Sequence, residues 1–207
     1  MQLLPRPQRY NPPVSKLNSD TSFQESHLRV IDKSDSHTNR KKRNQEGGDK
    51  VAIFIDGANL FYAAMHLGIE IDYSKLLQSL TKERHLLRAY FYTAVDSCND
   101  KQQGFLLWMR RNGYRVVSKE LNHLPDGSKK GNLDVEIAVD MLTLARYCDN
   151  IILLSGHGDL AYAVDTVTYL GVQVELVGLG SMTSESLINV ADSYTDLELI
   201  RENIQKV

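Results

Sequence analysis

The sequence predicts an α/β protein with a parallel sheet of about five strands and helices on both faces of the sheet. Two observations support this fold class. The first apolar run, VAIFI at residues 51–55, is continuous rather than alternating, as expected of a parallel strand that is covered on both faces. Further strand-like segments then alternate with segments of helical spacing, and this alternation is typical of parallel sheets with right-handed crossovers.

The first half of the predicted domain contains three strands. The apolar residues after the opening strand keep helical spacing as far as Gly68, and aromatic and β-branched residues mark the next strand. Gly113 ends a later helix before a segment of alternating residues. In order, the expected elements are the opening strand at 51–55, helices at 60–67 and 73–80, a strand at 86–95, a helix at 101–111 and a strand at 114–121.

The second half begins with a polar loop at 122–133, in which Pro125, Asp126 and Gly127 are typical of a turn. The next segment is apolar on most sides, which favours a helix buried against the sheet. In order, the expected elements are a helix at 134–148, a strand at 150–155, a helix that reaches residue 170, a strand at 172–178, a helix that contains Asn189, Ala191 and Asp192, and a polar amphipathic helix near 194–205.

Three acids lie where predicted strands end or helices begin. Asp56 follows the opening strand, Asp134 begins the helix after the polar loop, and Asp159 lies at the start of the helix after the fourth strand. Because the carboxyl ends of parallel strands meet at one edge, we expect these carboxylates to converge, with Asn59 orienting a neighbouring residue or a ligand beside them. Oxygen ligands suit Mg²⁺ or Mn²⁺, so a metal site is the simplest prediction.

Structural roles are open for the same residues. Asp134 and Asp159 could each cap the free amides of the helix that they begin. Asp140 lies far from Asp134 around the predicted helix, so it is a candidate of second rank. Lys130 also has second rank, because the loop lysines before this helix could hold phosphates over the site or could be ordinary exposed side chains.

The first fifty residues differ from the rest in composition. They are rich in Ser, Asn, Gln and Pro and carry ten Lys/Arg and six Asp/Glu, a net charge of +4, whereas residues 51–207 carry 14 and 20, a net charge of −6. We expect residues 1–49 to be a disordered, basic-leaning extension and residues 50–207 to form one domain. The cluster Arg40–Arg43 could contact RNA phosphates or be a solvated linker.

Several classes of protein are disfavoured. No apolar run approaches about 18 residues and no signal pattern opens the chain, so we expect a soluble, cytoplasmic protein without membrane contact. Cys98 and Cys148 belong to no CxxC motif, which argues against a zinc site or a disulfide. No GxGxxG follows a strand, which argues against a dinucleotide-binding module.

Four blocks of the sequence together resemble the NYN domain family, a group of PIN-like nucleases. The blocks are FIDGANL, KKGNLDVEIAVDM, LLSGHGDLAYAVDTVTYLGVQVELV and INVADSYTDL, and the match covers roughly residues 51–200. The ending SMTSESLINVADSYTDL is similar to the LabA-like bacterial branch in particular. The resemblance implies a PIN-like Rossmannoid fold and a metal-dependent endoribonuclease that hydrolyses RNA phosphodiester bonds, with single-stranded RNA as its partner.

The resemblance also implies a set of site residues. Asp56, Asn59, Asp134 and Asp159 match the polar positions of the family. Acids at these positions hold a divalent ion, Mg²⁺ or Mn²⁺, which activates water against the phosphodiester. Ser155 opens the block that usually reads Ser-Gly-Asp-x-Asp, and it is a second-rank candidate.

One position departs from this pattern, because His157 replaces the first acid of that block. Imidazole is a poor Mg²⁺ ligand but binds Mn²⁺ or Zn²⁺, so the change alters the choice of metal, weakens the catalytic centre or leaves a simple turn histidine. Two functions therefore stay open: a ribonuclease, and a regulator of gene expression that binds RNA or a protein partner. The LabA-like branch is linked with circadian output in cyanobacteria, which supports the regulator. Whether the chain forms a homodimer is open.

Overall fold

The computed structural model describes residues 49–96, 99–123 and 129–206, so the expected extension, apart from Asp49, and the expected turn at 125–127 lie outside the described residues. In chain order the elements are β1 (Lys50–Asp56), α2 (Gly57–Leu67), α3 (Tyr73–Thr81), β2 (His85–Val95), α4 (Asp100–Arg111), β3 (Tyr114–Glu120), β4 (Asn122–His123), β5 (Lys129–Lys130), α5 (Asp134–Leu144), β6 (Asn150–Leu154), the 3₁₀ helix η1 (Gly158–Leu160), α6 (Ala161–Tyr169), β7 (Gln173–Gly178), the 3₁₀ helix η2 (Gly180–Met182), α7 (Glu185–Ile188), β8 (Ser193–Asp196), the 3₁₀ helix η3 (Leu197–Ile200) and α8 (Arg201–Ile204).

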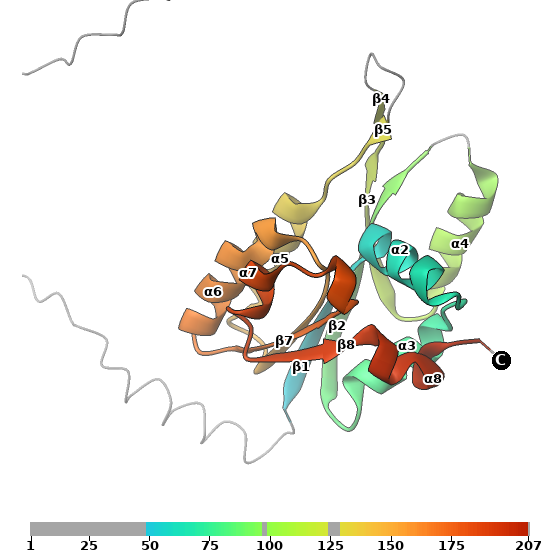
Figure 1. Ribbon diagram of the computed structural model, residues 1–207. Helices are drawn as coiled ribbons and strands as arrows, with labels where there is room; N and C mark the ends of the chain where they lie inside the picture. Colours follow the sequence, from blue (N-terminus) through green and yellow to red (C-terminus); the bar gives the residue numbers. More distant parts are fainter. Residues whose placement is uncertain (1–48, 97–98, 124–128, 207) are drawn as a thin grey trace, which may run out of the picture. The chain divides into compact units, whose positions relative to one another are not determined.

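The α/β fold class is confirmed. Among the described residues, six strands form one parallel sheet in the order β3-β2-β1-β6-β7-β8, and a short antiparallel pair, β4-β5, projects from the loop before α5 (Figure 1). Five of the six strands lie where the sequence predicted them. The sixth is β8, which lies in the segment that was expected to be helical.

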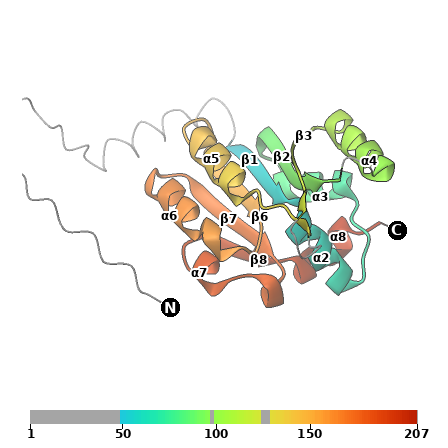
Figure 2. The ribbon, with the colours of Figure 1, turned by 90° about the horizontal axis from the view of Figure 1, so that it is seen from above.

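Each face of the sheet packs against its own group of helices (Figure 2). Alternate residues of β1 explain this arrangement. Val51, Ile53 and Ile55 pack with α2, α3, α4 and α8, whereas Ala52 and Phe54 pack with α5, α6 and α7. All five side chains are fully buried, which confirms that the continuous apolar run forms a strand covered on both faces.

The prediction of an amphipathic helix near 194–205 was wrong over its first part. Residues 193–196 pair in parallel with β7 as an edge strand, and only Arg201–Ile204 form an α-helix at the end. The Asp192 carboxylate accepts a hydrogen bond of 2.7 Å from the Val174 amide and so joins this segment to the edge of the sheet. Pairing with β7, which the sequence of the segment does not reveal, outweighs its helical spacing.

The order of the strands places a switch point beside β1. The chain adds β2 and β3 on one side of β1 and then returns to add β6, β7 and β8 on the other. The carboxyl ends of β1 and β6 therefore flank the point at which the order reverses, and ligands of open α/β sheets bind at such points.

Candidate functional site

Asp56 ends β1, and its two carboxylate oxygens have different partners. Oδ1 accepts hydrogen bonds of 3.1 Å from the backbone amides of Ala58 and Asn59, so Asp56 is the N-cap of α2. Oδ2 accepts a hydrogen bond of 3.2 Å from the hydroxyl of Ser155, which follows β6. The side chain is therefore held from both strands of the switch point while the residue is 7% exposed.

Asp134 begins α5 but does not cap it. The N-cap residue of α5 is Leu133, which makes no side-chain capping bond. The side chain of Asn132 instead contacts both the carboxylate and the backbone of Asp134. Its Nδ2 donates to Asp134 Oδ2 at 2.8 Å, and its Oδ1 accepts from the Asp134 amide at 2.6 Å. The second carboxylate oxygen, Oδ1, is left to face the switch point, so capping does not explain this acid.

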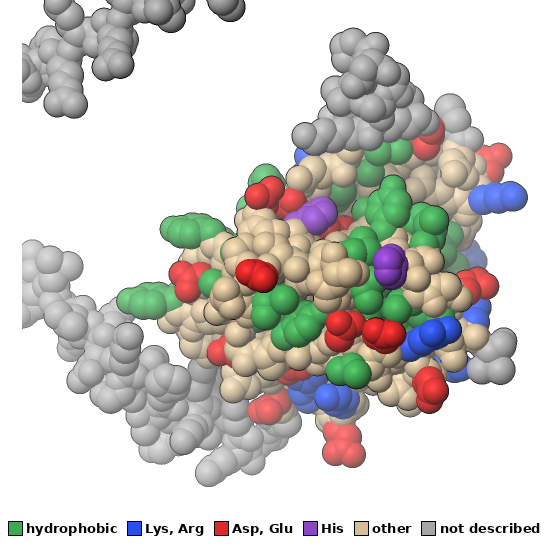
Figure 3. Space-filling view, viewed as in Figure 1, with side chains coloured by type: hydrophobic (Ala, Val, Ile, Leu, Met, Phe, Trp, Pro, Cys, Tyr) green, Lys and Arg blue, Asp and Glu red, His purple; other side chains and the backbone are tan. Residues whose placement is uncertain are grey.

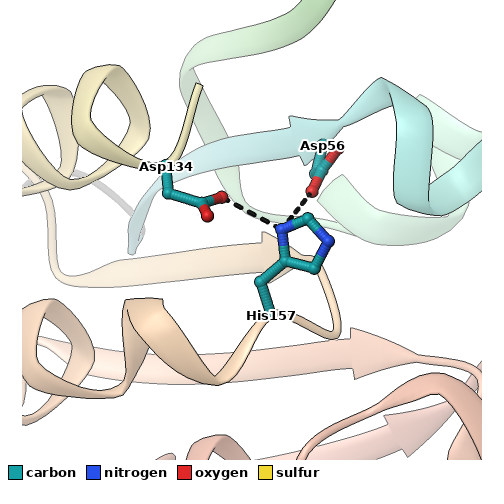
Figure 4. A group of neighbouring side chains, drawn as sticks. All are labelled: Asp56, Asp134 and His157. Carbon is teal, nitrogen blue, oxygen red and sulfur yellow. Dashed lines mark hydrogen bonds and ion pairs between the residues drawn. The ribbon is translucent and has the colours of Figure 1, made fainter. Parts of the chain in front are cut away.

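His157 completes the group, and its ring points between the two acids (Figure 4). Its Nδ1 lies 3.1 Å from Asp134 Oδ1 and 3.4 Å from Asp56 Oδ2. The His157 amide also donates to Ser155 Oγ at 3.3 Å, which ties the turn to the same serine that contacts Asp56. Three segments that are distant in the sequence therefore meet in one cluster.

The electrostatics of the cluster favour a positive charge between the acids. Burial raises the pKa of the Asp56 carboxyl above its ordinary value, and the negative charge of Asp134 adds to the rise, while the Asn59 amide, His157 and Ser155 oppose it. Burial lowers the pKa of His157, but the hydrogen bond to Asp134 and the charges of Asp56, Asp134 and Asp159 outweigh it and raise that pKa overall. A cation is stabilised where these side chains converge.

The geometry fits a divalent ion. One ligand atom from each of Asp56, Asp134 and His157 lies within 4.8 Å of the other two, and they line a cavity of about 140 Å³ together with Tyr92 and Asn132. Ligand bonds of about 2.1 Å require only a small inward movement of these atoms. With about 30 Å³ for each water, the cavity has room for an ion and a few water molecules.

The other predicted site residues lie at different distances from this cluster. Asn59 is buried, and its side-chain amide packs against the turn at Gly156. Asp159 is exposed in η1 and is not part of the three-residue group, although its charge reaches His157. Asp140 accepts a hydrogen bond of 2.8 Å from the Tyr92 hydroxyl, outside the group. The backbone of Lys130 pairs in β5, but its side chain lies outside the described residues.

Two residues of the site were missed from the sequence. Asn132 orients Asp134, and its position two residues before a helix acid is the signal that could have revealed it. Gly156 precedes His157, and a Cβ there would lie 2.0 Å from the backbone oxygen of Met182. This glycine lets the loop after β7 approach the turn that carries His157.

Fold and site together define a class: an α/β domain with carboxylates and an imidazole at the switch point of a parallel sheet. The NYN domain model matches residues 50–198, and this chain belongs to the NYN domain family. The chain is 34% identical over 165 residues to the low amplitude and bright protein LabA of Synechococcus elongatus, and the match covers 76% of this chain and 88% of that protein. This relative places the chain in the LabA-like branch.

A solved structure supports the same fold. The crystal structure of VPA0982, a protein of unknown function from Vibrio parahaemolyticus RIMD 2210633, has a TM-score of 0.68 and 29% sequence identity to this chain. The match covers 78% of this chain and 99% of that one. In the described part of the chain, no helix is both long and apolar enough to cross a membrane.

Proposed function

We propose that this protein is a metal-dependent endoribonuclease that hydrolyses single-stranded RNA. The observation that carries the proposal is the meeting of Asp56 Oδ2, Asp134 Oδ1 and His157 Nδ1 at the switch point. Membership of a family of PIN-like nucleases supports the same function. When bound by these three residues, Mg²⁺ or Mn²⁺ supplies an acidified water and a positive charge beside the scissile phosphodiester.

Different residues orient the carboxylates and supply the other groups of this site. Asp56 is fixed by the amides of α2 and by Ser155, and Asp134 is fixed by Asn132, so both carboxylates are oriented before a ligand arrives. Asp159 is exposed near the group, which suits a carboxylate that accepts a proton from the attacking water. The side-chain amide of Asn59 lies beside the turn at Gly156, and this proximity supports a role in orienting the turn that carries His157.

Cleavage of a labelled single-stranded RNA tests the proposal. The wild type should cleave with Mg²⁺ or Mn²⁺ and stop when a chelator removes the ion, and Asp56→Asn should be inactive. Asp56→Asn is a suitable control because the remaining amide oxygen can still cap α2. RNA binding without cleavage, in the presence of either Mg²⁺ or Mn²⁺, would contradict the proposed ribonuclease activity.

A second function has its own support. We propose as the alternative that the chain is a regulator of gene expression that binds RNA or a protein through a weakened nuclease scaffold. His157 already places an imidazole between Asp56 and Asp134, so the two acids have a partner without a metal. The similarity to LabA favours this function as well. Absence of metal binding by calorimetry, together with tight RNA binding, would select the regulator.

A further inference from the structure

A groove lined with aromatic side chains begins beside the acidic cavity. A larger cavity of about 590 Å³ opens between α2 and α4. It shares the lining residues Ala58, Thr93 and Ala94 with the acidic cavity. Phe61 and Tyr62 of α2 line it. We call this cavity and its continuation toward Trp108, a further cavity of about 670 Å³, the aromatic groove.

Three large aromatic side chains along the aromatic groove are exposed to solvent. Phe61 is 57% exposed, Tyr62 is 58% exposed and Trp108 is 41% exposed. Hydrophobic side chains gather over α2 on this face of the molecule (Figure 3). Contiguous exposed apolar side chains are a feature of ligand-binding surfaces.

The part of the aromatic groove that adjoins the acidic cavity has a lining that suits a nucleic acid strand in charge and chemistry. Its lining there includes Lys101 and the neutral polar side chains of Asn99, Gln102 and Thr93 and no acid, whereas the end of the groove at Trp108 is lined by Glu70, Asp72 and Lys206. A cation can contact a phosphate, and aromatic faces stack on bases of any sequence. Tyr73 and Phe105 form the floor with their ring centroids 5.2 Å apart, which gives the groove a firm base.

We propose that the aromatic groove holds the nucleotides that flank the scissile phosphate of single-stranded RNA, with bases stacked on Phe61, Tyr62 and Trp108. This inference rests on the proposed function, because the acidic cavity at one end of the groove would hold the phosphate. A base-paired duplex does not expose base faces to such side chains, so the groove selects single strands. The substrate therefore needs several unpaired nucleotides on one side of the cut.

The chain carries its own reporter for this binding. Trp108 is the single tryptophan of the sequence and lines the far end of the groove. Titration with a single-stranded oligoribonucleotide of about twelve nucleotides should quench its fluorescence, and a duplex of the same sequence should not. The titration is done without added metal and with a chelator, so it measures binding independently of cleavage.

Variants of the full-length chain then test the groove. Phe61→Ala and Tyr62→Ala should each weaken the affinity for the oligoribonucleotide by about fivefold to a hundredfold. Tyr162→Ala is the matched control, because Tyr162 is 83% exposed on α6 and lines none of the three cavities. Thermal unfolding of each variant checks that the fold is kept.

The outcomes separate the groove from the nuclease. RNA binding that depends on Phe61 and Tyr62 supports the groove even when no cleavage occurs. In that case only the proposal that the protein is a nuclease is contradicted. Cleavage and binding that are unchanged in both variants overturn the groove and leave the enzyme intact. A wild type that forms a dimer, which Phe61→Ala dissociates without changing RNA affinity, also overturns the proposal, because the groove then holds a second copy of the chain.

Discussion

The Nδ1 atom of His157 lies 3.1 Å from Oδ1 of Asp134, so an imidazole nitrogen belongs to the candidate metal site. The same atom lies 3.4 Å from Oδ2 of Asp56. A protonated His157 neutralises part of the charge of the two acids, whereas a deprotonated one can bind an ion. In the metal site that we propose, proton and metal compete for one nitrogen, and this competition governs the expected response to pH and to the choice of ion.

The stability of the metal-free protein should fall as the pH rises above about 6.5. The pKa of His157 is raised in the folded state, so its contribution is complete below the ordinary value of 6.5 and is lost as the pH rises through the folded pKa. The raised pKa of Asp56 acts in the same direction above its ordinary value of 3.8, because the folded state binds that proton more tightly.

Thermal unfolding with a chelator at stepped pH measures this effect. His157→Gln should flatten the fall above pH 6.5, and His66→Gln, which changes an exposed histidine of α2, should not. An equal slope in His157→Gln and the wild type would show that His157 does not cause the fall.

Replacing Asp56 should separate its two roles. Asp56→Asn keeps an oxygen that can accept from the Ala58 and Asn59 amides, and it removes a buried charge beside Asp134, so the metal-free variant should be at least as stable as the wild type at about pH 8. Asp56→Ala should be less stable than Asp56→Asn by about 1 kcal/mol, because the cap is removed.

Both Asp56 variants should lose Mn²⁺ affinity by more than about tenfold, measured by calorimetry. Denaturant unfolding gives the two free energies of unfolding. If Asp56→Asn is clearly destabilised and binds Mn²⁺ as the wild type does, Asp56 is only the cap of α2.

His157→Asp should shift the metal preference from Mn²⁺ toward Mg²⁺ and increase Mg²⁺-dependent cleavage of RNA. Nδ1 of histidine and Oδ1 of aspartate are both bonded to Cγ, so the new oxygen can reach the position of the present nitrogen. A hard oxygen ligand suits Mg²⁺ better than imidazole does.

Calorimetry with each metal and a cleavage assay measure this shift, and His66→Asp is the control for an added acid elsewhere. Tight metal binding by His157→Asp with no cleavage would mean that more than one catalytic feature is missing, and the regulator would then be the better description.

Gly156→Ala should destabilise the protein by about 1–3 kcal/mol, because the new Cβ would lie 2.0 Å from the Met182 backbone oxygen and the loops must separate. Metal affinity should fall as well, since His157 is the next residue. Gly104→Ala is the matched control, because nothing lies within 4 Å of its added Cβ in α4, and it should stabilise the protein by about 0.5–1 kcal/mol. Chemical denaturation of both variants checks the difference, and equal stabilities would refute the close approach.

Removal of residues 1–48 should leave the melting temperature nearly unchanged, because that segment lacks the apolar content that offsets chain entropy. Asp49 is kept, since its carbonyl accepts a hydrogen bond from the His85 amide. If Arg40–Arg43 binds RNA, the truncated chain should bind RNA more weakly and with a shallower salt dependence, by about one unit of slope for each phosphate that the cluster neutralises. Titrations at several salt concentrations measure this, and an unchanged slope would make the cluster a linker.

The sequence predicted five of the six strands of the parallel sheet, because each contains a recognisable hydrophobic or alternating run. It also predicted the convergence of Asp56 and Asp134, because the carboxyl ends of parallel strands lie at one edge of the sheet. It did not predict β8, a short edge strand that exists by pairing with β7. Side-chain directions inside a turn also escaped prediction. The turn after β6 aims His157, rather than Asp159, between the acids, and that choice depends on contacts with Ser155 and with the loop at Met182.

The hydrogen bond between Ser155 and Asp56 joins residues that are 99 positions apart in the chain. While the protein is being synthesised, β1, β2 and β3 leave the ribosome long before β6 and the turn that carries His157. A nascent chain therefore has no assembled site until β6 has emerged and paired with β1. A protein that cleaves RNA, as we propose for this one, is thus inert through the earlier part of its own translation, beside the messenger and the ribosome that produce it.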